Sequence, residues 1–275
     1  MRNFNISSPQ SVSLLSLDAA LQPSGHSIVT KTEKKLLEEM PGAMAVYIAL
    51  NQALKEKCAP FLPFCRSQIG QDLLVLALSE PKDQGFFVEF GGCDGSTFSN
   101  THMLENQLGW NGIVAEPAVV WHKRLHNNRN CHIDQRCVFS QSGLSLPFLE
   151  ASSVNQEQSA PELSSLSAYA KGSWTAGPNQ SNNREYNVET VSLNDLLDDH
   201  HAPAEIDYIS IDTEGSELAI LEAFDFHKRK VKFFTIEHNY QEQQRQQIHE
   251  LMSSHNYERV LPEISLWDDW YALRS

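Results

Sequence analysis

Short apolar runs alternate with helical patterns from about residue 66 onward, and this alternation restricts the possible folds more than any other feature of the chain. The clearest apolar runs are 86–90, 112–116, 206–211 and 232–237, and a further strand is expected near 136–139. The stretches between the runs repeat hydrophobic residues at helical spacing, which predicts helices such as the one at 97–108. Before residue 66, helical patterns begin near Thr32 and cover 43–57. Strands separated by helices pair in parallel, and the helices cover both faces of the sheet. We therefore expect an α/β fold with a doubly wound, mostly parallel sheet.

Two segments lie outside this pattern. Residues 1–65 contain too few apolar groups to fold alone, so we predict a partly helical N-terminal extension followed by a main domain at 66–275. Within that domain, 151–187 is rich in Ser, Asn and Gln. Irregular segments of this length inside a domain are often functional, which makes this insertion a candidate lid.

The composition excludes several classes of partner. The chain has 275 residues, 35 of them acidic and 21 basic, for a net charge of −14. This balance argues against general binding to nucleic acid or to anionic membranes. No apolar run reaches the roughly 18–20 residues of a membrane span, and no secretory signal is recognisable. The five cysteines include no CxxC, which argues against structural zinc and a disulfide framework, so we expect a cytoplasmic protein.

A glycine-rich loop follows the first apolar run, with the sequence Glu89-Phe90-Gly91-Gly92-Cys93-Asp94-Gly95. The end of a strand before a helix is where an α/β sheet forms its ligand crevice, and glycines let the backbone approach a ligand closely. The spacing differs from GxGxxG and no Gly-Lys-Ser/Thr follows, which argues against a nicotinamide enzyme and a P-loop. A ligand loop and a plain tight turn both remain compatible with this pattern.

The next strand supports the ligand interpretation. Glu116 ends this strand 21 residues after Gly95, a separation at which a carboxylate can accept hydrogen bonds from ribose hydroxyls. Together with Glu89, it predicts a crevice lined by carboxylates, which suits a cationic cofactor better than a phosphorylated one. S-adenosylmethionine has a sulfonium, an ammonium and a ribose but no phosphate, so it fits these requirements.

The order of four motifs resembles the FkbM family of methyltransferases, over about residues 66–273. The motifs are Ser67-Gln68-Ile69-Gly70-Gln71-Asp72, Phe87-Val88-Glu89-Phe90-Gly91, Trp110-Asn111-Gly112-Ile113-Val114-Ala115-Glu116-Pro117 and Ile211-Asp212-Thr213-Glu214-Gly215-Ser216-Glu217, and 236–240 resembles a recurring family variant. The resemblance implies a class I Rossmann-like sheet of strand order 3-2-1-4-5-7-6. It also implies O-methylation, with S-adenosylmethionine as cofactor, of a hydroxyl on a carbohydrate or related small metabolite.

The resemblance further implies which residues bind the cofactor. Those of the glycine-rich loop would shape the methionine pocket, Glu116 would bind the ribose, and residues near the end of strand three would flank the adenine. The full expected set is Gln68, Gln71, Asp72, Glu89, Phe90, Gly91, Gly92, Asp94, Gly95, Asn100, Glu116, Pro117, Asp134, Cys137, Val138 and Asp212. The family's loop often has the form Asp-x-Gly-Ala-Asn-x-Gly, from which this chain departs at Glu89, Gly92 and Cys93. We expect binding to survive this departure, with the role of Cys93 open.

Methyl transfer to a hydroxyl benefits from a base, and the predicted crevice offers three candidates. Asp212 follows the strand expected at 206–211, which alternates too little to be half-exposed and is therefore expected to be buried. A buried strand has no structural need for a carboxylate at its tip. Glu214 and His238 are the other two candidates. Asp212, Glu237 and His238 are also suitable ligands for a divalent cation, although we assign no metal site. Glu217 fits better as a cap of the following helix.

We therefore predict an S-adenosylmethionine-dependent O-methyltransferase acting on a hydroxyl-bearing small molecule or glycan. A monomer and a homodimer are both compatible with the sequence. In the insertion, Tyr169 and Trp174 are expected to stack on the acceptor. The alternative is a catalytically inactive module of the same fold that acts through residues 1–65. Retention of the crevice carboxylates favours the enzyme.

Overall fold

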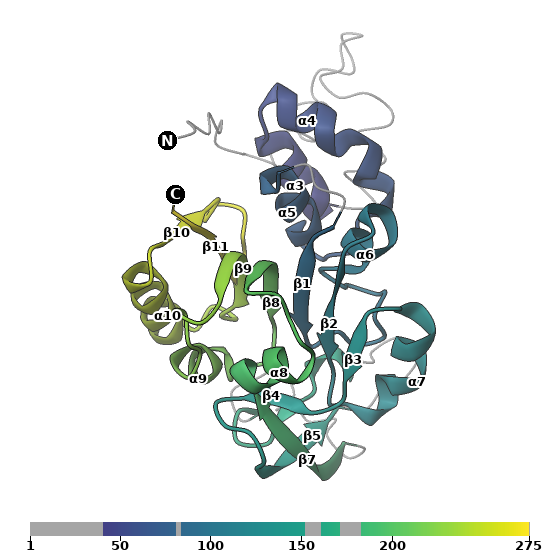
Figure 1. Ribbon diagram of the computed structural model, residues 1–275, viewed down its shortest axis with the longest axis vertical. Helices are drawn as coiled ribbons and strands as arrows, with labels where there is room; N and C mark the ends of the chain where they lie inside the picture. The colour runs from purple at the N-terminus through teal and green to yellow at the C-terminus, as the bar shows by residue number, and fades with distance from the viewer. Residues whose placement is uncertain (1–40, 81–83, 152–160, 171–182, 275) are drawn as a thin grey trace, which may run out of the picture.

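The computed structural model describes residues 41–80, 84–151, 161–170 and 183–274, and a seven-stranded sheet forms its centre (Figure 1). The strands pair in the order β10-β11-β9-β8-β1-β2-β3. Their bounds are β1 Phe86–Phe90, β2 Asn111–Ala115, β3 His132–Asp134, β8 Glu205–Ile211, β9 Lys230–Glu237, β10 Tyr257–Val260 and β11 Asp268–Leu273.

This topology confirms the predicted fold class. Numbered along the chain within this sheet, the strands follow the order 3-2-1-4-5-7-6 from β3 to β10. The pairs β1–β2, β2–β3, β1–β8 and β8–β9 are parallel, whereas β11 is antiparallel to both β9 and β10. The carboxyl ends of β1, β2, β8 and β9 therefore lie at one edge of the sheet.

A second sheet lies beside the first and was not predicted. It has the order β4-β7-β5-β6, with bounds β4 Cys137–Phe139, β5 Ser145–Glu150, β6 Ser165–Leu166 and β7 Arg184–Ser192. The strand predicted near 136–139 as the third of the main sheet is therefore β4 of the second sheet, and β3 takes that place in the main one. The predicted insertion at 151–187 includes β6 and the start of β7, whereas Trp174 lies outside the described residues.

Most helices follow the predicted positions. The helices after β1 are α6 His102–Leu108, α7 Val119–Asn128, α8 Leu193–Asp199, α9 Glu217–Glu222 and α10 Glu242–Ser254. The predicted helix at 97–108 begins only at His102, because the residues before it turn back to bind Glu89: the backbone N–H of Asn100 and the hydroxyl of Thr101 both donate to this carboxylate. None of these helices, nor any other in the described ranges, is long and apolar enough to cross a membrane.

The N-terminal helices pack against one end of the main sheet (Figure 1). They are α3 Pro41–Ala49, α4 Gln52–Cys58, a 3₁₀ helix at Ala59–Phe64 and α5 Gln71–Leu78. One helix was predicted over 43–57, but the chain breaks it at Asn51, whose side chain caps α4 by accepting from the Leu54 N–H at 3.1 Å. Met44 and Val46 of α3 belong to the same buried cluster as Trp270 of β11. A helical start predicted near Thr32 lies outside the described residues.

Candidate active site

A cavity of about 400 Å³ opens at the carboxyl ends of β1, β2, β8 and β9. Gly91, Glu116, Asp212 and Glu237, which end these strands or follow them directly, line it. Residues of the second sheet and the 162–166 segment form the opposite wall. The cavity therefore lies where an open α/β sheet binds its ligands, and its size suits a small organic molecule.

Most of the predicted cofactor-binding residues line this cavity. They are Gln68, Glu89, Phe90, Gly91, Asn100, Glu116, Pro117, Cys137, Val138 and Asp212. They come from segments far apart in the sequence, which the parallel sheet brings to one edge. The glycine-rich loop closes tightly here: a Cβ on Gly91, where φ is 69°, would lie 2.2 Å from the backbone oxygen of Asp212.

The remaining predicted residues lie outside the cavity lining and have structural contacts. The Gln71 side chain donates to Asp268 at 2.9 Å, and Asp72 accepts from the backbone N–H groups of Arg66 and Ser67. These contacts fix the start of α5 against the sheet. Gly92 packs so closely that an added Cβ would lie 2.2 Å from the side chain of Val114. The prediction that these residues contact a cofactor has no support from their positions.

The side chains of two further predicted residues, Asp94 and Asp134, also bind other parts of the chain and lie outside the cavity lining. Asp94 accepts from the N–H groups of Ser96 and Thr97 and so closes the turn after the glycine-rich loop. Asp134 binds Arg136 at 2.6 Å and His200 at 2.9 Å. Gly95 lies under Arg129, where an added Cβ would be 2.6 Å from that side chain.

The carboxylate of Glu89 is fully bound within the protein. It accepts from Ser99 and Thr101 hydroxyls at 2.9 and 2.6 Å and forms a buried ion pair with Arg129 at 3.1 Å. Sequence reasoning missed Arg129, because it lies 40 residues along the chain at the end of α7. Glu89 therefore shapes the loop at the cavity edge and is not a free negative charge.

Glu116 presents a buried carboxylate held by backbone donors. One oxygen accepts from the Cys93 N–H at 2.8 Å and the other from the Ala118 N–H at 2.7 Å. Burial raises the pKa of Glu116 to about 7. Its place at the end of β2, on the cavity wall, is the one predicted for a ribose-binding carboxylate.

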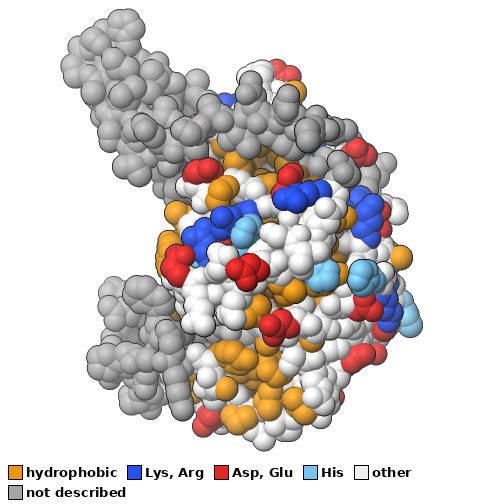
Figure 2. Space-filling model, turned by 90° about the vertical axis from the view of Figure 1, so that its left-hand side faces the viewer, with side chains coloured by type: hydrophobic (Ala, Val, Ile, Leu, Met, Phe, Trp, Pro, Cys, Tyr) orange, Lys and Arg blue, Asp and Glu red, His pale blue; other side chains and the backbone are white. Residues whose placement is uncertain are grey.

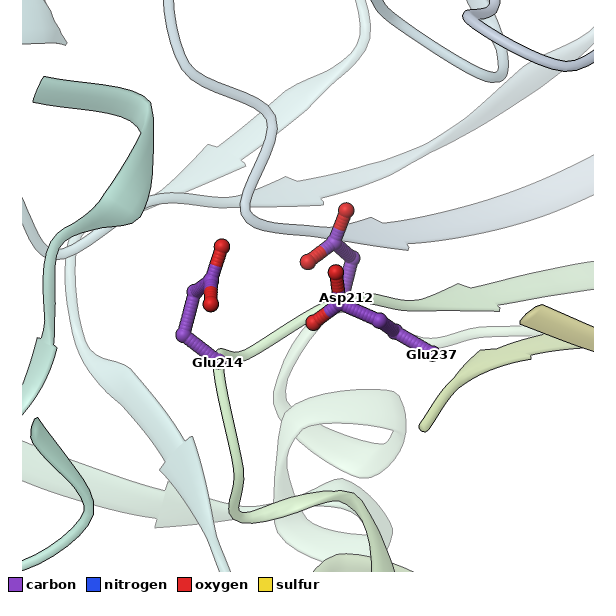
Figure 3. Close-up of side chains that lie close together, drawn as sticks. All are labelled: Asp212, Glu214 and Glu237. Carbon is purple, nitrogen blue, oxygen red and sulfur yellow. The ribbon is translucent and has the colours of Figure 1, made fainter. Parts of the chain in front are cut away.

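Three carboxylates gather in the lining of the same cavity, at the ends of β8 and β9 (Figure 3). One oxygen from each of Asp212, Glu214 and Glu237 lies within 4.8 Å of the others. Burial, followed by repulsion from neighbouring carboxylates, raises the pKa of Asp212 to about 7 and that of Glu214 to about 8, and holds that of Glu237 well above its ordinary value. Sequence reasoning named Asp212 and Glu214 as catalytic, and it grouped Glu237 with Asp212 and His238 as possible cation ligands; the structure places Glu214, and not His238, in this group.

His238, the third predicted catalytic residue, lies behind the cavity wall. Its Nδ1 accepts from the Tyr240 N–H at 3.0 Å, and its Nε2 lies 3.9 Å from Asp269. Burial lowers the pKa of His238, which favours the neutral ring. Glu217, predicted as a helix cap, instead accepts from the N–H groups of Thr213 and Gly215 at 3.0 and 2.8 Å and so fixes the loop that leads into α9.

Left-handed backbone at non-glycine residues concentrates around the cavity. Cys93, Phe98, Glu214, Asn239 and Tyr240 have φ values of 48°, 62°, 58°, 47° and 57°, and all five line it. Such conformations cost about 1–3 kcal/mol each and persist where the surroundings impose them, often at functional sites. Phe98 and Tyr240 are 48% and 60% exposed, and so place two aromatic rings at the cavity mouth.

Comparisons with known proteins were made for the sequence and for the fold. The model of the methyltransferase FkbM domain matches residues 89–259, more than half of the chain. No curated protein sequence matches significantly. Among solved structures, a methyltransferase FkbM from Methylobacillus flagellatus KT is 12% identical, with a TM-score of 0.43, over 87% of this chain.

Two other solved structures are similar at the same low level. The fibrillarin/Nop5p complex structure is 12% identical over 79% of this chain and 84% of its own, with a TM-score of 0.39. The CurJ carbon methyltransferase is 9% identical over 96% of this chain and 81% of its own, with a TM-score of 0.36. This chain covers only 60% of the length of the Methylobacillus structure. The domain match, from the end of β1 into β10, confirms the predicted resemblance: the chain belongs to the FkbM methyltransferase family.

Proposed function

We propose that this protein transfers a methyl group from S-adenosylmethionine to a hydroxyl of a carbohydrate or related small metabolite. The observation that supports this most is that Glu116, at the end of β2, and the cluster of Asp212, Glu214 and Glu237, at the ends of β8 and β9, line one cavity. The family membership supports the methyltransferase class. The choice of a carbohydrate rests on the family resemblance and on the aromatic rings at the cavity mouth.

The chemistry of the cavity wall suits this cofactor. Glu116 offers carboxylate oxygens to ribose hydroxyls, while Val138 and Phe148 supply an apolar wall for a planar base. Asp212 places negative charge near the glycine-rich loop, where the cationic part of the molecule would bind. Among the described residues that line the cavity there is no Lys or Arg to pair with a phosphate.

Bound S-adenosylmethionine supplies a methyl group on a sulfonium, and transfer breaks this S–C bond, forms an O–C bond to the acceptor and leaves S-adenosylhomocysteine. The chain's own task is to orient the acceptor hydroxyl and to accept its proton. We assign the proton to Glu214. Its pKa of about 8 lies near the operating pH, and Asn239 orients it by donating at 3.2 Å.

The distribution of surface charge supports a small acceptor over a nucleic acid. On the face drawn in Figure 2, acidic and basic side chains are interspersed, and hydrophobic side chains gather toward its lower part. The net charge of the chain is −14. A phosphate backbone requires a continuous basic surface, so these features favour a neutral hydroxyl compound.

Calorimetric titration with S-adenosylmethionine, and separately with NADH, tests the cofactor. Micromolar binding of S-adenosylmethionine alone is expected, with loss in Glu116→Ala and no change in Glu258→Ala, a substitution at an exposed acid of β10. A screen of hydroxyl acceptors with methyl-labelled cofactor then identifies the methylated oxygen. Absence of binding to either compound would contradict the proposal and favour an inactive module of this fold.

A further inference from the structure

Most buried acidic side chains outside the cluster are compensated in the described residues. Asp268, beside the cluster, forms no ion pair there and accepts from the Gln71 side-chain amide at 2.9 Å. Glu89 pairs with Arg129 at 3.1 Å, and Asp269 pairs with Arg245 at 2.9 Å. Glu116 has no basic partner but accepts two backbone N–H groups. Compensation of this kind is expected, because an unpaired charge is costly to bury.

The cluster of Asp212, Glu214 and Glu237 lacks such compensation. Within the described ranges, none of these three carboxylates forms an ion pair with a Lys, Arg or His. The side chain of Asn239 donates to Glu214 at 3.2 Å, and this is the one side-chain donor outside the cluster that reaches it in the same ranges. Three neighbouring carboxylates therefore face one another with a single amide donor between them.

A second observation, independent of this proximity, concerns Glu237. Its side chain is buried, with 6% of the residue exposed, and its Oε2 has no hydrogen-bond partner in the described part of the chain. Figure 3 shows that its carboxylate points toward Asp212. An orphaned carboxylate oxygen costs the full desolvation penalty of the group, so a partner in this position would remove a large unfavourable term.

We propose that Asp212, Glu214 and Glu237 bind a hard divalent cation of the Mg²⁺ class. Carboxylate oxygens are the ligands that Mg²⁺, Mn²⁺ and Ca²⁺ prefer, whereas the cluster includes no thiolate or imidazole to favour a softer metal. Asp212 and Glu214 lie in the loop directly after β8, and Glu237 is the last residue of β9, so the main sheet positions the site.

The role of the cation deepens the proposed function and rests on it. A cation in this cluster would lie at the cavity wall, where it can bind the acceptor oxygen and lower the pKa of its hydroxyl. Mg²⁺ keeps open positions for such ligands when only a few carboxylates hold it. A carboxylate has about four lone-pair sites, so Glu214 can contact the cation through one oxygen and accept a hydrogen bond from the acceptor hydroxyl through the other. The cation would lower the pKa of Glu214, so the base role assigned to it above applies to the metal-free cluster.

Electron paramagnetic resonance of Mn²⁺ tests the site without any activity measurement. The full-length chain, freed of metal with EDTA and dialysed, is titrated with Mn²⁺ in the presence of S-adenosylhomocysteine, and the loss of the free-ion signal is followed. One bound Mn²⁺ per chain is expected, displaced by excess Mg²⁺. Glu237→Gln and Asp212→Asn should each weaken binding at least tenfold, while the surface variant Glu258→Gln should bind as the wild type does.

The outcomes separate the cation site from the proposed function. An unchanged free Mn²⁺ signal up to millimolar protein would overturn the site and would mean that shared protons hold the cluster together. Mn²⁺ binding that survives in both Glu237→Gln and Asp212→Asn would overturn the site as well.

Two further outcomes separate the site from the proposed function. Loss of S-adenosylmethionine affinity in Glu237→Gln, without Mn²⁺ binding by the wild type, would overturn the cation site and assign the cluster to the cofactor. Mn²⁺ binding without cofactor binding would leave the site intact and contradict the proposed function. Thermal melts confirm that each variant is folded.

Discussion

Two carboxylates near strand ends, Glu89 and Asp212, differ in whether a basic side chain pairs with them, although both follow similar sequence patterns. Glu89 ends β1 and is neutralised by Arg129, whereas Asp212 follows β8 and has no basic partner among the described residues. The sequence predicted that both lie at the crevice, because each follows an apolar run. It could not predict Arg129, since the contact depends on how α7 packs against the loop after β1.

The Glu89–Arg129 pair provides a prediction about stability. Arg129→Met removes the partner of a buried carboxylate, and breaking a buried pair typically costs about 3–5 kcal/mol. We expect the free energy of unfolding in urea to fall by this amount. Arg274→Met serves as the control, because its ion pair with Glu258 is half exposed and such pairs contribute about 0–1 kcal/mol. Equal losses in both variants would mean that Arg129 is not a buried partner of Glu89.

Glu116 gives a second prediction, for the pH dependence of cofactor binding. Its pKa is raised to about 7, so the carboxylate is largely protonated at pH 6 and largely ionised at pH 8. The ionised form accepts from both ribose hydroxyls, so the affinity for S-adenosylmethionine should rise between these two pH values. Glu116→Gln should remove this dependence. In the free protein the sign is reversed: a raised pKa makes the folded state bind more protons, so this group's contribution to stability falls as the pH rises from about 4.5 to about 7.

At the scale of elements, the local sequence pattern predicted the buried strands but not the half-exposed ones. β8 is buried from Ile206 to Ile211. Asp207 and Ser210 interrupt its hydrophobic residues, but the run alternates too little for a half-exposed strand, and this was sufficient to predict it. β7 alternates exposed residues such as Glu189 with buried ones such as Val188, inside a segment of polar composition. Its pairing with β4 and β5 determines its structure, and no local pattern reports that pairing.

The second sheet also places Tyr169 beside the candidate site, which gives a prediction for the acceptor. Its side chain lies against Gly215, 3.2 Å from the position of a Cβ there, and its ring packs edge-on against Phe139 at 6.2 Å. Tyr169→Ala should raise the acceptor KM severalfold and leave the affinity for S-adenosylmethionine unchanged. Steady-state kinetics and calorimetry measure the two quantities. A weaker cofactor affinity with an unchanged KM would contradict the acceptor role of this segment.

At the scale of the whole molecule, the family fold predicted where the active site lies but not how its charges are balanced. The strand order places the ends of β1, β2, β8 and β9 side by side, and most predicted cofactor residues lie there. Residues predicted from motif position alone, such as Asp72 and Asp134, bind other parts of the chain. A motif specifies a place in the sequence, and packing then decides which side chains remain free for a ligand.

Because the carboxylates of Asp212, Glu214 and Glu237 lack basic partners, we expect the metal-free wild type to be less stable than a variant in which one of these charges is removed. Glu237 is costly to bury whether it is ionised beside two carboxylates or must take up a proton to fold. Glu237→Gln removes this cost, and its amide can donate to Asp212. We therefore expect a gain of about 1 kcal/mol, which raises the melting temperature by about 2–4 °C for a chain of this size, measured at pH 8 with EDTA.

The same substitution should reduce methyl transfer, because sites that need buried charge are stabilised when the charge is removed. Glu258→Gln, at an exposed position, should change the free energy of unfolding by no more than about 0.5 kcal/mol and should leave activity intact. A lower melting temperature for Glu237→Gln in EDTA would show that the cluster is stabilising by itself. If Glu237→Gln is destabilised but fully active, then Glu237 stabilises the sheet and takes no part in methyl transfer.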